Sequence, residues 1–217
     1  MKRHKSKYAS FSAEKEALSK IKINLDFIDI EKNIKCIMIT SAVPNEGKSF
    51  IAANIAKSIA SGDKKVLLID ADMRNATLQK LFPLENRSGL SAIIASKADW
   101  KKSLNNTDNA NLHIISSGRT PPNPTELLSS KQMKNMILEM KQDYDFIIID
   151  TPPILPVSDA IALSAVVDGV LLVTRWGKTA KQLVIEAKHA LTLANAPLIG
   201  AILNDVRPIY GEYYYNY

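Results

Sequence analysis

The sequence has little cysteine and no long hydrophobic run, and each absence excludes a class of protein. Cys36 is the single cysteine among 217 residues, so the chain cannot build an intramolecular disulfide framework or a cysteine-rich metal centre of its own. No apolar run approaches the roughly 18 residues of a transmembrane helix. The basic N-terminus, "MKRHKSKYASFS", lacks the apolar segment of a secretory signal. We therefore expect a cytoplasmic protein.

The remaining composition is that of a soluble globular domain. The chain is 46% hydrophobic and 23% charged, and its length suits one well-buried domain better than two. Near-continuous apolar runs alternate with helix-like segments, which is typical of strands buried on both faces of a parallel sheet. We expect strands within residues 34–40, 64–70, 111–117, 145–150, 169–175 and 197–204. The pattern predicts an α/β fold, with a mostly parallel open sheet flanked by helices on both faces.

The two ends of the chain depart from this pattern. We expect a basic, flexible N-terminus over residues 1–13, a single domain over 14–206 and a tyrosine-rich tail over 207–217. The net charge of +6 is unevenly distributed, because four basic residues precede the first acidic one: Lys2, Arg3, Lys5 and Lys7. Such a cluster is typical of a contact with an anionic membrane or a nucleic acid, and equally of a solvated tail.

The stretch "TSAVPNEGKSF", residues 40–50, ends like a phosphate-binding loop in Gly47, Lys48 and Ser49. It follows a predicted strand and opens a predicted helix, which is the context that G-x-x-x-x-G-K-[ST] requires, although Ala42 stands at the first glycine position. Backbone N–H groups at the helix start would surround phosphates. Lys48 would reach the terminal phosphates and Ser49 would bind Mg²⁺. The loop therefore indicates a nucleotide site on a P-loop NTPase-like fold.

Two further predicted strands end in carboxylates. The segment "VLLIDADMR" closes with Asp70 and Asp72, and "DFIIIDTPP" closes with Asp150 in the form of a Walker B aspartate. A lone aspartate at a strand end is commonly a cap or turn residue. Three of them in a chain that also carries Lys48 favour a site for Mg²⁺, which prefers oxygen ligands. A base beside the transferred phosphoryl group is useful when the acceptor is a hydroxyl.

Five of the seven tyrosines lie in the last eight residues, "YGEYYYNY". The polar and flexible residues between them argue against a core segment. The cluster favours a site of tyrosine phosphorylation, and the alternative is an ordering tail that packs on a neighbour. The five are Tyr210, Tyr213, Tyr214, Tyr215 and Tyr217.

These motifs, in this order, resemble the bacterial tyrosine kinases. The resemblance covers roughly residues 14–217. It rests on the motifs "TSAVPNEGKS", "LLIDADMR", "GRTPPNPTELLSS" and "FIIIDTPP" and on the tyrosine tail. More narrowly, the chain resembles the separate cytoplasmic kinase subunit of Gram-positive capsule and exopolysaccharide operons. In that family a loop without the first glycine is normal, so Ala42 is a family trait.

The resemblance implies ATP and Mg²⁺ as ligands and assigns the site residues. Asp70 would be the base that takes the tyrosine proton, with Lys48 and Asp72 as the other catalytic residues, and Asn204 would contact the adenine. Mg²⁺ would be held by Ser49, Asp72 and Asp150. The nucleotide contacts on the loop would be Val43, Pro44, Asn45, Glu46, Gly47, Lys48, Ser49 and Phe50.

The resemblance also implies partners. A membrane-spanning activator would recruit the kinase to the inner face of the plasma membrane, a tyrosine phosphatase would reverse the modification, and the tail would be phosphorylated in trans within a homo-oligomer. We expect no nucleic-acid partner. The family's oligomerisation helix carries two arginines, but "EALSKIKIN" has Ser19 and Lys22 there. Because lysine does not replace a bidentate arginine, oligomerisation could depend on the activator, and the helix, expected over residues 12–30, could equally pack within the chain.

We therefore interpret the chain as an ATP- and Mg²⁺-dependent protein-tyrosine kinase that autophosphorylates its tail and regulates capsular or exopolysaccharide synthesis and export. A MinD- or ParA-like positioning ATPase is the main alternative. Such ATPases carry a signature lysine five residues before the catalytic one, where this chain has Val43. A third hypothesis is that the chain is a scaffold that binds nucleotide without turning it over.

Overall fold

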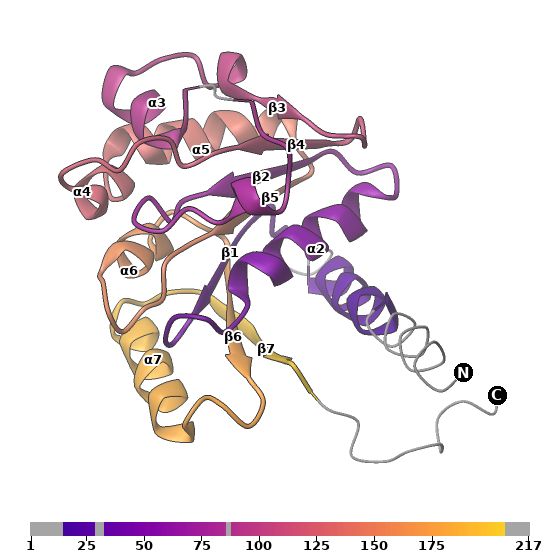
Figure 1. The fold of residues 1–217 in the computed structure, drawn as a ribbon, viewed down its shortest axis with the longest axis vertical. Coiled ribbons are helices and arrows are strands. Elements are labelled where there is room, and N and C mark those ends of the chain that lie inside the picture. The colour runs from indigo at the N-terminus through magenta and orange to yellow at the C-terminus, as the bar shows by residue number, and fades with distance from the viewer. Residues whose placement is uncertain (1–14, 29–32, 86–87, 207–217) are drawn as a thin grey trace.

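A central, mostly parallel sheet organises the fold, as the apolar runs predict (Figure 1). The computed structural model describes residues 15–28, 33–85 and 88–206. Its seven strands lie in the order β3-β4-β2-β5-β1-β6-β7, and every neighbouring pair is parallel except β3 and β4. The strands are β1 (Cys36–Ser41), β2 (Val66–Asp70), β3 (Asn105–Asn106), β4 (Leu112–Ile115), β5 (Phe146–Asp150), β6 (Gly169–Arg175) and β7 (Leu198–Asn204). Each predicted run overlaps a strand, and β3, which has no apolar run of its own, was not predicted.

Helices cover both faces of the sheet, which confirms the predicted fold class. One face packs against α2 (Lys48–Ala60) and the helix at residues 15–28. The other face packs against the remaining helices. These are α3 (Leu90–Ser96), α4 (Pro124–Leu128), α5 (Lys131–Asp143), α6 (Asp159–Ser164) and α7 (Lys181–Leu193). Two short 3₁₀ turns, η1 (Leu78–Lys80) and η2 (Trp100–Ser103), complete the described elements.

The helix at residues 15–28 lies within the predicted range and packs on the domain. Leu25 is buried against the sheet, and Leu18, Ile21 and Ile28 are partly buried beside it. Phe27 on the same helix is 64% exposed. The helix therefore makes the intramolecular contact that was one of its two interpretations. No helix in the described ranges is long and apolar enough to cross a membrane.

The sheet order brings together the strand ends that carry the predicted site residues. β1 lies between β5 and β6, and β2 lies on the other side of β5. Asp70 at the end of β2 is the register partner of Asp150 at the end of β5, and Ile39 of β1 pairs with Asp150 from the other side. Because parallel strands end at one edge of a sheet, the loop after β1 joins these carboxylates at a single site.

Candidate active site

The phosphate loop connects β1 to α2, and its backbone explains where glycine is needed. Asn45 has a φ of 65° and Gly47 a φ of 86°, both in the left-handed region. Ala42 is not among the described residues with positive φ, so its position does not demand glycine. At Gly47 a Cβ would also lie 2.2 Å from Nδ2 of Asn204. Glycine is therefore required at position 47 and dispensable at position 42.

Glu46 holds the loop in shape from within. The N–H of Ala42 donates to its Oε2 at 3.2 Å, and the hydroxyl of Thr179 donates to its Oε1. Asn204 donates from Nδ2 to the backbone oxygen of Glu46 at 2.9 Å. Glu46, predicted as a nucleotide contact, thus uses its carboxylate on the loop itself. The predicted contact of Asn204 with adenine stays a prediction, because the structure places its amide against the loop backbone.

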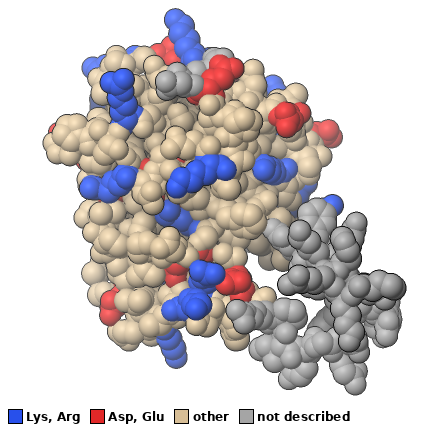
Figure 2. All heavy atoms as spheres, viewed as in Figure 1, with Lys and Arg blue, Asp and Glu red and all other residues tan. Residues whose placement is uncertain are grey.

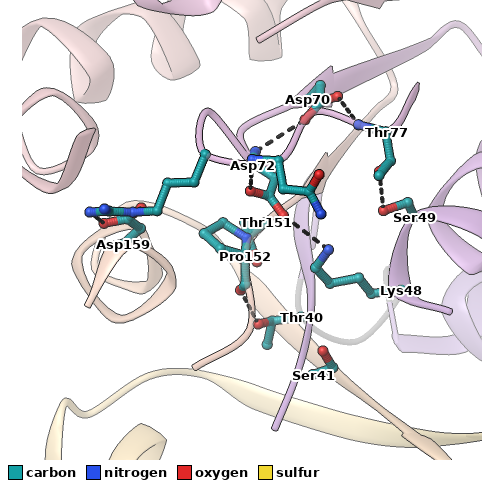
Figure 3. A network of polar contacts seen from close by, with 12 residues as sticks. Thr40, Ser41, Lys48, Ser49, Asp70, Asp72, Thr77, Thr151, Pro152 and Asp159 are labelled. Carbon is teal, nitrogen blue, oxygen red and sulfur yellow. Dashed lines mark hydrogen bonds and ion pairs between the residues drawn. The ribbon is translucent and has the colours of Figure 1, made fainter. Parts of the chain in front are cut away.

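Lys48 and Asp72 form a buried ion pair at the centre of the site (Figure 3). Nζ of Lys48 lies 3.1 Å from Oδ2 of Asp72, and the two side chains are 11% and 3% exposed. Both residues were predicted to be catalytic, and the fold brings them together from α2 and from the segment after β2. The pair neutralises a cation and an anion that would be costly to bury alone.

Asp70 is held by three backbone N–H groups of its own segment. Those of Thr77 and Leu78 lie 3.3 and 3.2 Å from its Oδ2, and that of Asp72 lies 3.1 Å from its Oδ1. Burial raises the pKa of Asp70 to about 6, and the charge of Asp72 adds to the rise while the N–H donors oppose it. A carboxylate that is still ionised near neutral pH, but more basic than usual, suits a general base.

Asp150 is fully buried, and neither of its carboxylate oxygens has a hydrogen-bond partner among the described residues. Burial raises its pKa to about 7, and the nearby Asp70 adds to this, while Lys48 and the neighbouring Ser49 hydroxyl act in the opposite direction. A buried, unpaired carboxyl group is costly. It is therefore the feature that most strongly indicates a place for a cation.

The donors at this site fit a magnesium–nucleotide complex. Ser49, Asp72 and Asp150 offer only oxygen atoms, which Mg²⁺ prefers. Within the described ranges, no group of three or more His, Cys, Asp or Glu side chains could hold a metal ion by itself. Mg²⁺ usually takes one or two carboxylates and completes its shell with phosphate and water oxygens. The residues therefore fit a metal that arrives with its nucleotide.

Two contacts at the site were not predicted from the sequence. Arg74 forms a bidentate ion pair with the buried Asp159 of α6, with Nε–Oδ2 at 2.7 Å and Nη2–Oδ1 at 3.0 Å. The hydroxyl of Thr77 donates to Oγ of Ser49 at 2.6 Å. Neither contact has a sequence signal, because each joins segments that only the fold brings together.

A cleft of about 910 Å³ opens beside Asp70. Its walls come from the segment after β2, from α3 and from the segment after β4, which includes Arg119, Thr120 and Pro121. The backbones of two walls touch, because the N–H of Leu90 donates to Ser116 O at 2.7 Å. The "RTPPNPTELL" segment thus borders the cleft next to the predicted base. Asp70 itself is 1% exposed and contributes to the lining of this cleft.

The tyrosine cluster and the basic N-terminus lie outside the described residues, so their predictions stay predictions. On the face that Figure 2 shows, the described Lys and Arg side chains are dispersed over largely uncharged surface. That face of the described part carries no continuous basic patch, which is the usual electrostatic footprint of a nucleic-acid site.

Sequence comparisons agree with this geometry. Residues 34–195 match the family model described as an AAA domain. The chain is 45% identical over 193 residues to the tyrosine-protein kinase YwqD of Bacillus subtilis, which covers 89% of this chain and 81% of that protein. It is 38% identical over 192 residues to the tyrosine-protein kinase etk of Escherichia coli, covering 88% of this chain and 26% of that longer protein.

Structural comparisons lead to the same family. The solved kinase domain of Escherichia coli tyrosine kinase ETK matches with a TM-score of 0.85 at 36% identity, over 93% of this chain and 80% of that one. MinD from Pyrococcus horikoshii matches with a TM-score of 0.67 at 23% identity, over 78% of this chain and 69% of that one, and shows a shared fold alone. With the P-loop, the buried aspartates and these relatives in place, the chain belongs to the bacterial tyrosine-protein kinases.

Proposed function

We propose that this kinase transfers the γ-phosphoryl group of ATP, with Mg²⁺, to the tyrosines of its own C-terminal tail. The observation that carries the proposal is the position of Asp70. It is a buried carboxylate of raised pKa that lines an open cleft, and Thr77, whose N–H donates to it, also contacts Ser49 at the end of the phosphate loop. A hydrolase that activates water has no need of a cleft of this size beside its base.

Different residues of the chain would bind the phosphates, accept the proton and hold the metal ion. The loop amides and Lys48 hold the phosphates of ATP, which requires Lys48 to exchange Asp72 for phosphate oxygens. The phenol of the acceptor enters the cleft, and Asp70 accepts its proton as the phenol oxygen bonds to the γ-phosphorus. The bond from that phosphorus to the bridging oxygen breaks, and ADP leaves. Mg²⁺, held by Ser49, Asp72 and Asp150, would neutralise charge on the phosphates.

The family supports the wider setting of this proposal. The chain is 41% identical to CapB of Staphylococcus aureus over 91% of its length, and a solved chimera named CapA2B2 matches it with a TM-score of 0.77 at 35% identity. We infer that it works at the inner face of the plasma membrane with a membrane-spanning activator and a tyrosine phosphatase. Its output would be regulation of capsular or exopolysaccharide synthesis and export, and its active form a homo-oligomer.

The test is incubation of the purified full chain with ATP and Mg²⁺, with and without the cytoplasmic segment of the activator. Intact mass and phosphopeptide mapping then report the modified residues, beside Lys48→Met and a chain that ends at Val206. Phosphate on the tail tyrosines, absent from Lys48→Met, is the expected result. ATP consumption without phosphotyrosine in both conditions would refute the proposal.

That opposite result is what a positioning ATPase of the MinD kind would give. The shared fold alone favours this second candidate. Val43, at the position where such ATPases carry their signature lysine, argues against it.

A further inference from the structure

Thr77 contacts both Ser49 and Asp70, and the contact that its hydroxyl makes is not explained by local structure. It precedes η1, as the N-cap residue, but its side chain makes no capping hydrogen bond to that turn. Capping is the usual reason for a threonine at such a position. Here the hydroxyl instead donates to Oγ of Ser49 at 2.6 Å, across 28 residues of sequence (Figure 3).

The contact fixes how the Ser49 hydroxyl is used. A serine hydroxyl has one donor hydrogen and two acceptor lone pairs. Thr77 occupies one lone pair, which leaves the second lone pair for a metal ion and the O–H free to turn toward a neighbouring acceptor. Without this partner, Ser49, in the first turn of α2, could rotate and bond to nearby backbone groups, as serine commonly does. Thr77 thus holds Ser49 in the orientation that a metal ligand needs.

The backbone of the same residue reaches the predicted base. The N–H of Thr77 donates to Oδ2 of Asp70 at 3.3 Å, and the next N–H, of Leu78, donates to the same oxygen at 3.2 Å. A shift of Thr77 toward or away from Ser49 would therefore move donors to Asp70. One residue connects the side of the site that binds metal to the side that takes the proton.

We propose that Thr77 is a positioning residue that orients the Ser49 hydroxyl for Mg²⁺ and couples that ligand to Asp70. This role rests on the proposed magnesium–nucleotide function. Partners that orient metal ligands typically contribute about 10- to 100-fold in metal affinity or activity when they are removed. Loss of the Thr77 hydroxyl is therefore expected to raise about 10-fold the Mg²⁺ concentration at which Mg²⁺ has half of its effect on nucleotide binding.

The test is a fluorescence titration of mant-ADP binding to the full chain across a series of Mg²⁺ concentrations, with EDTA as the metal-free reference. Thr77→Val removes the hydroxyl and keeps the shape, and Thr77→Ser restores it. Thr107→Val is the matched control, because Thr107 is also half-buried and its hydroxyl donates to Asn109 and Leu112 carbonyls at 3.0 Å, beside β4. Thr77→Ala serves as a second removal variant in case Thr77→Val folds poorly.

We expect the Thr77→Val protein to need about 10-fold more Mg²⁺ for half of its effect, with unchanged binding in EDTA. Thr77→Ser and Thr107→Val should match the wild type. A Thr77→Val or Thr77→Ala protein with the wild-type magnesium dependence would overturn the role, and so would an equal loss in Thr107→Val. A wild type whose nucleotide binding ignores Mg²⁺ would instead refute the proposed function, and this role with it.

Discussion

Replacing Asp150 by asparagine should change the free energy of unfolding more favourably at pH 8 than at pH 5. The Asp150 carboxyl group has no hydrogen-bond partner among the described residues, and burial raises its pKa from 3.8 to about 7. Between these values the folded protein keeps a proton that the unfolded chain has released. The stability that this proton provides is fully present below about pH 4 and is lost as the pH rises to about 7.

The magnitude follows from the size of the shift. One pKa unit corresponds to about 1.4 kcal/mol, so the interval from pH 5 to the folded-state pKa costs the wild type about 3 kcal/mol of unfolding free energy. Asparagine carries no titrating proton and avoids this loss. Any packing cost of the amide is the same at every pH, so it cancels when the two pH values are compared.

Urea unfolding of both proteins at pH 5, 6, 7 and 8, in buffer with EDTA, measures the difference. Asp63→Asn, at an exposed position, controls for removing a carboxyl group without burial. Added Mg²⁺ with ADP should stabilise the wild type at pH 8 more than the variant, because a ligand stabilises the state that binds it. A stability difference between wild type and Asp150→Asn that stays flat within about 1 kcal/mol from pH 5 to 8 would refute the reasoning.

Four other outcomes are expected. Gly47→Ala should abolish nucleotide binding, because the φ of Gly47 is 86° and the new Cβ would lie 2.2 Å from an amide nitrogen. Gly62→Ala, whose new Cβ would lie 3.4 Å from Nζ of Lys22, should bind normally in the same titration. Arg74→Gln should lower the unfolding free energy by about 2 kcal/mol or more, since it leaves the buried Asp159 without its ion-pair partner; equal urea midpoints would contradict this. Asp70→Asn should lower the phosphorylation rate about 10²- to 10⁴-fold while mant-ADP still binds, as expected for loss of a general base. Heavy tail phosphorylation should dissociate the oligomer, because each phosphotyrosine adds about −1.5 to −2 charges, and an unchanged size by light scattering at full phosphorylation would refute it.

The sequence by itself determined the class of fold and the candidate residues of the site. Near-continuous apolar runs can be satisfied only by burial on both faces, so the parallel sheet and its flanking helices were predictable. Asp70 and Asp150 were predictable because each ends such a run, where parallel strands place ligand contacts, and Lys48 was predictable from the phosphate-loop pattern that follows one. These signals are local, and each can be read within about ten residues of chain.

Tertiary structure decided which groups meet. Asp72 pairs with Lys48, Arg74 pairs with Asp159, and Thr77 donates to Ser49, in each case across segments that the sheet order brings together. The short strand β3 forms only because β4 offers it an edge, since its Asn105–Asn106 sequence carries no apolar signal. The raised pKa values of Asp70 and Asp150 have the same origin. Burial and the approach of a second carboxylate set them, and both are properties of the packed molecule that no stretch of sequence contains.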